Sequence, residues 1–267
     1  MREDSTGSVF LRAELDRLEW SLHLPFLFFT LGRQPVSLGR SHLLGVMDVF
    51  APFPPFALDA DVKPGVDALR GRLILCDNLE STVLVHNRSN MVIQGTEYGT
   101  AGTLDLLAGR LRDRPWAAVA WEGTWRETAG WMESMLVGGY GQVALGVEHH
   151  LPRTRLSVEG IVQHPDPQTR PDTVQRWFQE GLRRLPCTRC GMLYVEHKWH
   201  PMVRTGLGTL FSADDRSAAI MLQIFLDWSD TQDMGLWYFE GIPSSVTDPG
   251  SVGGTGRWIG LYSRWSW

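Results

Sequence analysis

The chain has 267 residues, of which 43% are hydrophobic and 21% are charged, and its formal net charge is −5 at pH 7. These values are ordinary for a globular protein and exclude a largely disordered chain. The acidic balance argues against a nucleic-acid-binding face spread over the whole molecule. The apolar run 22–31 is short, contains Pro25 and follows acidic residues, so we expect neither a signal peptide nor a membrane span there. The protein is therefore expected to be soluble and intracellular, cytoplasmic or nuclear.

The first residues are expected to form a helix and then a strand. Leucines at positions 11, 15, 18 and 22 alternate with charged residues and predict an amphipathic helix over about 9–22. The run 26–31 predicts a buried strand. Three prolines within 51–56 remove backbone donors, so this stretch is expected to be a rigid exposed connection. Phe53 and Phe56 are candidate partner-binding residues on it, whereas the simpler interpretation is a plain connector.

A hairpin is the clearest local prediction. Two apolar runs, 73–76 and 83–85, flank a polar turn and predict antiparallel strands over 71–86, joined at Asp77 to Ser81. With Pro35-Val-Ser-Leu-Gly39 before it and Met91-Val-Ile-Gln-Gly95 after it, the stretch 35–95 resembles the SUKH superfamily. That family includes bacterial toxin-immunity proteins and accessory proteins encoded in the unique short region of herpesviruses and other DNA viruses. The resemblance implies a module that binds and neutralises another protein.

In the rest of the chain, helix-like and strand-like runs are segregated rather than strictly alternating. A short helix is expected over 104–111, an antiparallel meander over 116–162, and a second helix over about 172–185, after a proline-rich linker at 164–171. Further strands are expected at 192–195, 218–228 and 236–239. The fold class is therefore predicted to be α+β, mainly antiparallel sheet with a few flanking helices. Two regions are expected: an α+β domain over 1–163, and a β-rich region over 172–267 that belongs either to the same domain or to a second one.

One tight group of metal-ligand residues stands out. Cys187 and Cys190 form a Cys-x2-Cys pair, and His197 and His200 form a His-x2-His pair six residues later. Thiolates and imidazoles are the ligands of structural zinc, so the four residues predict one structural Zn site. The alternative is two unpaired buried thiols and two surface histidines.

Other constellations are weaker. Glu148-His149-His150 could serve acid–base chemistry, but neighbours on a strand point to opposite faces, so only alternate members would cooperate and a surface loop is the preferred interpretation. The segments 250–256 and 101–105 are similar to the phosphate and sugar motifs of dUTPases, without that family's serine-rich motif. No Walker loop or nucleophile elbow is present in the sequence.

The leading hypothesis from the sequence is a non-enzymatic protein-binding module of the immunity or viral host-defence-blocking type. Twelve tryptophans, several beside acidic residues, suit a binding surface, and Trp121, Trp125 and Trp131 are the candidate anchors. A protein partner is expected, with no membrane contact and no nucleic acid. The alternative is an enzyme acting on nucleotides or nucleic acid through a degenerate dUTPase-like or zinc-supported site, so enzymatic activity is left open.

Overall fold

The computed structural model describes residues 17–50, 65–164, 185, 187–229, 232–242 and 256–265. All regular structure in these ranges is β-strand, and the fifteen strands form one antiparallel sheet. The strands are β1 (Leu18–His23), β2 (Leu27–Pro35), β3 (Gly65–Cys76), β4 (Leu79–Asn87), β5 (Asn90–Gly99), β6 (Gly102–Leu111), β7 (Arg114–Trp125), β8 (Thr128–Val137), β9 (Tyr140–His150), β10 (Thr154–His164), β11 (Arg189–His200), β12 (Val203–Ser212), β13 (Ala218–Ser229), β14 (Gln232–Ile242) and β15 (Arg257–Trp265).

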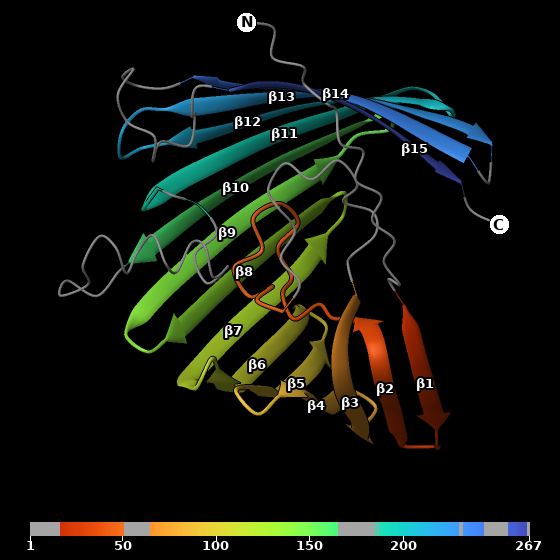
Figure 1. Ribbon diagram of the computed structural model, residues 1–267, viewed down its shortest axis with the longest axis vertical. Coiled ribbons are helices and arrows are strands. Elements are labelled where there is room, and N and C mark those ends of the chain that lie inside the picture. Colours follow the sequence, from red (N-terminus) through yellow and green to blue (C-terminus); the bar gives the residue numbers. More distant parts are fainter. Residues whose placement is uncertain are drawn as a thin grey trace, which may run out of the picture.

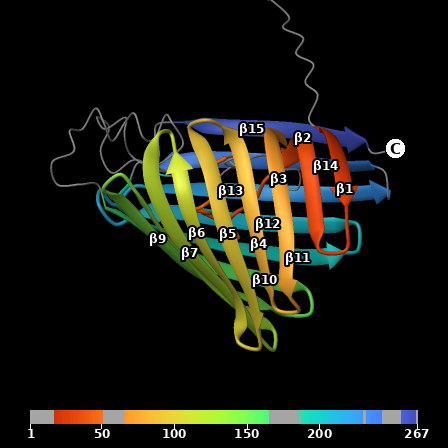
Figure 2. The same ribbon diagram turned by 90° about the horizontal axis from the view of Figure 1, so that it is seen from below.

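The sheet is a continuous meander in which every strand pairs with the next one along the chain. It curves strongly, so that β1 and β15 approach the same side of the molecule (Figures 1 and 2). Because fifteen is an odd number of alternating strands, β1 and β15 run in the same direction. No ladder between β1 and β15 is recorded within the described ranges, so the curved sheet has two edges there.

The connections differ at the two ends of the strands. At one end, turns of two or three residues follow every odd-numbered strand from β1 to β11, such as Asp77–Asn78 and Arg126–Glu127. At the other end lie the long connections, after β2, β10 and β14, together with a few tight turns such as Gly138–Gly139. We call these the short-turn rim and the long-loop rim.

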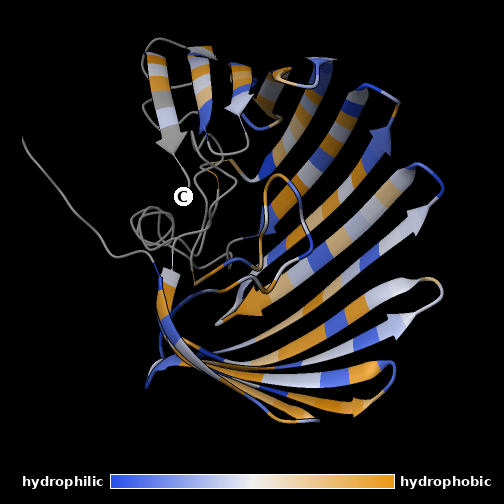
Figure 3. Cartoon of the chain, turned by 90° about the vertical axis from the view of Figure 1, so that its right-hand side faces the viewer, coloured by the Kyte–Doolittle hydropathy of each residue, from blue (hydrophilic) through white to orange (hydrophobic). Residues whose placement is uncertain are grey.

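The two faces of the sheet differ in exposure with the two-residue period of a strand. In β8, Ala129, Trp131, Glu133, Met135 and Val137 are buried, whereas Met132 and Leu136 between them are exposed. The same alternation runs through β9 and β10. The buried side chains lie on the concave side, which we call the lumen, and the exposed ones on the convex outer face. The hydropathy pattern along the strands is visible in Figure 3.

The structure corrects the predicted fold class, because the described residues are all-β and contain no helix. The expected helix 104–111 is strand β6, in which Asp105 and Leu107 are buried and Leu106 is exposed. The described end of the expected helix 9–22 is strand β1. In β1, Leu18, Trp20 and Leu22 recur with a period of two, whereas the leucines of β6 lie on both faces of the strand. Neither short window distinguishes a strand from a helix. The predicted helix 172–185 lies almost wholly outside the described residues.

Other expectations are confirmed. The hairpin over 71–86 is β3 paired with β4, with a shorter turn than predicted, at Asp77–Asn78. The meander over 116–162 is β7 to β10. The sheet also continues across the expected linker, since β10 pairs with β11. No described segment is a helix of the length and apolarity that crossing a membrane requires.

Candidate functional site

The chain after β2 turns into the lumen. Residues 36–50, which we call the inner segment, lie against the concave face of the central strands (Figures 1 and 3). Val36, Leu38, Leu44, Val46 and Met47 of this segment are buried and belong to the main hydrophobic core. The inner segment forms no strand of its own. Its backbone therefore needs polar partners from the sheet.

Glu133 of β8 supplies one set of these partners. Its Oε1 accepts hydrogen bonds from the backbone N–H of Arg40 and from that of Ser41 at 2.6 Å, and its Oε2 accepts one from Met47 N–H at 3.2 Å. The Glu133 side chain is fully buried. Gly39 permits this close approach, because a Cβ there would lie 2.3 Å from Glu133 Oε1. The three donors stabilise the carboxylate, which in turn fixes the path of the segment.

Glu159 of β10 holds the middle of the inner segment. It accepts hydrogen bonds from Ser41 Oγ at 2.5 Å, from Leu43 N–H at 3.1 Å and from Leu44 N–H at 3.0 Å. Its fourth donor is the indole Nε1 of Trp131, at 3.1 Å from Oε2. Gln142 of β9 completes the attachment by donating to Val46 O at 3.0 Å. Buried carboxylates need such partners, since an unpaired charge in the interior is very costly.

Arg40 of the inner segment contacts carboxylates on β6 and β7. Its Nε lies 2.5 Å from Asp105 Oδ2 and its Nη1 lies 3.9 Å from Glu122. The other oxygen of Asp105 accepts from Thr96 Oγ1 at 2.6 Å and from Gln94 Nε2 at 2.9 Å. Burial alone would lower the pKa of Arg40, but its hydrogen bond and attraction to Asp105 outweigh burial and raise it. Arg40 is thus a fixed positive charge against the lumen wall.

His42 projects between two carboxylates. Its ring is stacked on Trp131, with centroids 4.1 Å apart and an interplanar angle of 24°. Nε2 lies 3.3 Å from Glu122 Oε1, and Nδ1 lies 3.5 Å from Glu148 Oε2. Glu148 also accepts from Ser157 Oγ at 2.6 Å and lies 2.7 Å from His150 Nε2. His42 therefore fastens the inner segment to both β7 and β9.

A row of alternating charges continues along the lumen wall beyond His42. Arg155 lies 4.0 Å from Glu148 and 3.3 Å from Glu196. Arg204 then lies 3.7 Å from Glu196 and 3.4 Å from Asp227. These side chains come from successive strands, β9 to β13. This row of the lumen wall is consequently polar and paired, and it lies beside the hydrophobic core that the inner segment covers.

The chemistry of this site is binding and positioning. Its carboxylates are occupied by backbone N–H groups, an arginine and hydroxyl groups, and no nucleophile with an adjacent base and orienting group occurs among the residues that hold the inner segment. What the arrangement does is place a folded segment across the concave side of a curved sheet. It thereby narrows the space that the sheet surrounds.

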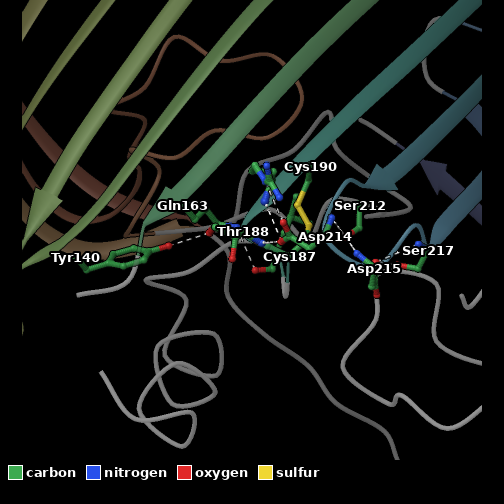
Figure 4. The surroundings of a disulfide bond; sticks show 11 residues. Tyr140, Gln163, Cys187, Thr188, Cys190, Ser212, Asp214, Asp215 and Ser217 are labelled. Carbon is green, nitrogen blue, oxygen red and sulfur yellow. Dashed lines mark hydrogen bonds and ion pairs between the residues drawn. A yellow bond between two sulfur atoms is a disulfide. The ribbon is translucent and has the colours of Figure 1, made fainter. Parts of the chain in front are cut away.

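The predicted zinc ligands are placed far apart. Cys187 and Cys190 form a disulfide, shown in Figure 4, and Cys190 is the second residue of the strand that carries His197. Seven residues of extended strand separate these two positions by roughly 23 Å. His197 Nδ1 lies 2.9 Å from Thr154 Oγ1, and His200 accepts from Met202 N–H at 3.3 Å. The described ranges hold no group of three metal-ligating side chains, and zinc binding stays a prediction.

The predicted partner-binding residues lie on different faces. Trp131 is buried in the lumen beneath His42, whereas Trp121 and Trp125 are on the outer face of β7, with Trp125 at the short-turn rim. Phe53 and Phe56 lie outside the described residues. The structure therefore does not bring these five residues together as one surface.

Sequence reasoning missed the residues that hold the inner segment. Asp105, Glu133 and Glu159 each follow an exposed or half-buried apolar residue in a strand-like run, at a position where the period of two points inward. A single acidic residue at an inward position of an apolar strand is therefore the sequence feature that could have identified these residues. Glu148 and His150 are alternate members of one strand and do cooperate, as the strand geometry required; the preferred surface-loop interpretation is wrong, because both belong to β9 and Glu148 is buried.

No protein-family profile and no curated protein matches the sequence. The fold, however, resembles solved outer-membrane β-barrel channels over most of the chain. Acinetobacter baumannii OccAB4 aligns with a TM-score of 0.57 and 9% identity, covering 92% of this chain and 72% of that one. Pseudomonas aeruginosa OccK10 (OpdN) aligns with a TM-score of 0.57 and 9% identity, covering 91% and 81%. Pseudomonas aeruginosa OccK11 (OpdR) aligns with a TM-score of 0.56 and 7% identity, covering 92% and 79%.

These likenesses overturn several expectations from the sequence. The SUKH resemblance is wrong, because the hairpin within 35–95 is one unit of a fifteen-stranded meander. The partner-neutralising module, the immunity and viral accessory roles, the intracellular location and the exclusion of membrane contact are contradicted by the same finding. The error has a physical cause. Hairpins with tight turns occur in many kinds of sheet, and one hairpin does not indicate how many strands the whole sheet contains. The chain has the all-β, porin-like barrel fold.

Proposed function

We propose that this protein is a channel of the outer-membrane type, which passes small polar solutes through a lumen narrowed by the inner segment. The observation that carries the proposal is the contrast between the two faces of the sheet. Outward positions from β8 to β13 are apolar yet exposed, whereas the charged side chains of these strands, apart from Arg189, point inward, beside the hydrophobic core that the inner segment covers. A water-soluble sheet leaves its polar face exposed, so an apolar face that is exposed over six strands suits a sheet that is surrounded by lipid.

The outer face supports a membrane position in detail. From β8 to β13 its exposed side chains are mainly Val, Leu, Ile, Met and aromatic residues, such as Leu145, Val158 and Leu222. These strands, all of them described, carry no outward Asp, Glu or Lys, and their outward arginine, Arg189, stands at the first residue of β11. Strands of about ten residues are also the length that spans a bilayer when tilted. Charges at mid-strand would be costly in that setting.

The short-turn rim carries aromatic side chains. Phe26, Trp125, Trp199 and Trp228 lie in or beside its turns, and each exposes more than half of its surface. Tryptophan and related rings favour the boundary between lipid and water, because one part of the ring system is apolar and another is polar. The rim is therefore suited to the interface of a bilayer.

The lumen suggests the class of solute. It presents paired charges of both signs, from Glu148 and Arg155 to Arg204 and Asp227, so a passing solute meets hydrogen-bonding groups rather than apolar surface. The inner segment fills part of the space beside them (Figure 3). Small polar molecules fit such a passage, whereas large or apolar ones do not.

The test is ion conductance of the purified, full-length chain in planar lipid bilayers. Discrete conductance steps are expected, and the double variant Glu133→Ala with Glu159→Ala should increase the step size because it releases the inner segment. Ser134→Ala, on the outer face of the same strand, is the matched control and should leave the conductance unchanged. A chain that inserts into the bilayer without any conductance, in the wild type and in the double variant, would refute the channel.

A further inference from the structure

The outer face of the sheet contains a groove between β9, β10, β11 and β12. It encloses about 270 Å³ and is walled chiefly by Val143, Leu145, Val162 and Phe211. Its floor includes Gly160 of β10, which stands directly opposite Gly191 of β11 in register. Gly160 leaves a depression in a face that is otherwise covered by larger apolar side chains.

The two glycines have different surroundings, and the difference defines the groove. The ring of Phe211 lies over Gly191, so that a Cβ there would be 2.2 Å from Phe211 Cζ. At Gly160, by contrast, the nearest atom to an added Cβ is the Cys190 carbonyl oxygen at 3.9 Å. Phe211 therefore forms one wall, and the space above Gly160 is open from the outside.

One end of the groove is polar. Arg189 lies at the long-loop rim, exposes 65% of its side chain, and its Nε is 3.2 Å from Asp214 Oδ1. From this end the groove leads into the apolar outer face, toward Leu145 and Gly160. A slot with an apolar interior and a charged pair at its end matches the order of chemistry along a membrane lipid, whose polar headgroup precedes a hydrocarbon chain.

We propose that this groove binds one acyl chain of a membrane phospholipid, with the headgroup at the level of Arg189 and Asp214. The proposal rests on the proposed membrane position. In a bilayer, an unfilled depression forfeits dispersion contacts, and a flexible hydrocarbon chain fills it more readily than a rigid body does. A second copy of the chain is the less suitable occupant, since a stable dimer needs a complementary patch of about 1,000 Å² or more rather than a narrow slot.

The test compares Gly160→Leu with Gly95→Leu. Gly95 also faces outward, on β5, and nothing lies within 4 Å of an added Cβ there, so both variants add the same side chain to the same face. Each protein is reconstituted into nanodiscs of phosphatidylethanolamine and phosphatidylglycerol, extracted in mild detergent, and its retained phospholipid is counted by native mass spectrometry. Gly160→Ala serves as a milder version, because it adds only one carbon.

Wild type and Gly95→Leu are expected to retain one phospholipid each. Gly160→Leu should bind it about tenfold more weakly, because its side chain displaces about two methylene groups of the acyl chain from the groove. Gly160→Ala should give an intermediate loss. Equal phospholipid retention by all proteins that enter nanodiscs would refute lipid binding in the groove, but it would not contradict the proposed channel function. A wild-type dimer that Gly160→Leu converts to a monomer would also overturn it, because the occupant would then be a second copy. Failure of every protein to enter nanodiscs would refute the membrane position itself.

Discussion

Strands β8 to β10, which we call the central wall, and the edge strand β1 have the same strand geometry but different surroundings. In β8 every second side chain is buried, and the inner segment covers that face through Glu133. In β1 all six residues are exposed on both faces, although the strand is fully paired with β2. Backbone pairing is thus the same in the two regions. What differs is the presence of a second layer on the concave side.

This difference locates the structural role of the inner segment. A strand pairing alone stabilises little, whereas a covered face adds buried apolar contacts and satisfied polar groups. The inner segment provides both to β8, β9 and β10, because its apolar residues enter the core and its backbone N–H groups meet Glu133 and Glu159. Variants that remove this cover should make the central wall resemble the edge.

The largest effect is expected from Glu133→Ala. The change leaves three backbone N–H groups, the part-buried ones of Arg40 and Ser41 and the buried one of Met47, without their acceptor. The expected loss in the free energy of unfolding is about 3–5 kcal/mol, measured by urea denaturation of protein folded into lipid vesicles. Ser134→Ala is the control and should change it by less than about 0.5 kcal/mol. Equal losses in the two variants would show that the inner segment does not stabilise the wall.

The next effect concerns the outer face of the same wall. Val158→Arg places a charge near the middle of β10, and Leu136→Arg places one beside the last residue of β8. If the face is in lipid, the first should cost about 2–4 kcal/mol and the second about 0–1 kcal/mol, because the cost depends on depth. The same vesicle denaturation measures both. A small cost for Val158→Arg would place this face in water.

A smaller effect is expected from His42→Ala, which removes a ring stacked on Trp131 at 4.1 Å. Such aromatic pairs contribute about 0.5–1.5 kcal/mol, so the free energy of unfolding should fall by about 1 kcal/mol. His149→Ala is the matched control, since His149 faces outward and contacts Thr128. The bilayer conductance of His42→Ala should increase modestly while that of His149→Ala stays unchanged. The opposite ranking would mean that His42 does not hold the inner segment.

The sequence predicts strands where alternation is strict and turns are tight, and there the structure agrees. The hairpin at Asp77–Asn78 and the meander from β7 to β10 follow from apolar runs separated by short polar stretches. The helices predicted over 9–22 and 104–111 rest on leucines that recur at intervals of one to four residues. Such spacing does not distinguish a strand from a helix in a short window, and the pairing partners that decide between them are not local.

The candidate site was out of reach for a different reason. Glu133 lies 93 positions from Arg40, and Glu159 lies 118 positions from Ser41. The local sequence around the inner segment gives no sign of the strands that carry its partners, and theirs gives no sign of it. The contacts form only when the sheet has curved round the inner segment. The apolar outer face is present in the sequence only as many tryptophan and leucine residues. A buried core accounts for such a composition equally well.

The smallest effect should come from Asp214→Asn, at the long-loop rim and away from the covered wall. The Asp214 carboxylate accepts from the N–H groups of Thr188 and Arg189 and pairs with the Arg189 guanidinium. Burial alone would raise its pKa, but these hydrogen bonds outweigh burial and lower the pKa below its usual range. A carboxylate with a lowered folded pKa stabilises the fold above its unfolded pKa of about 3.9, and this contribution is lost as the pH falls through the folded value.

The free energy of unfolding should therefore differ between wild type and Asp214→Asn by less than about 1 kcal/mol at pH 7, since the group is largely solvated. That difference should stay constant down to about pH 5 and shrink below about pH 4, as the wild-type carboxyl takes up its proton. Asp77→Asn, in the turn at the opposite rim, controls for the general effect of removing a charge. A gap that persists unchanged at pH 2 would show that the amide disturbs the Cys187–Cys190 loop sterically rather than electrostatically, because both side chains would then be neutral.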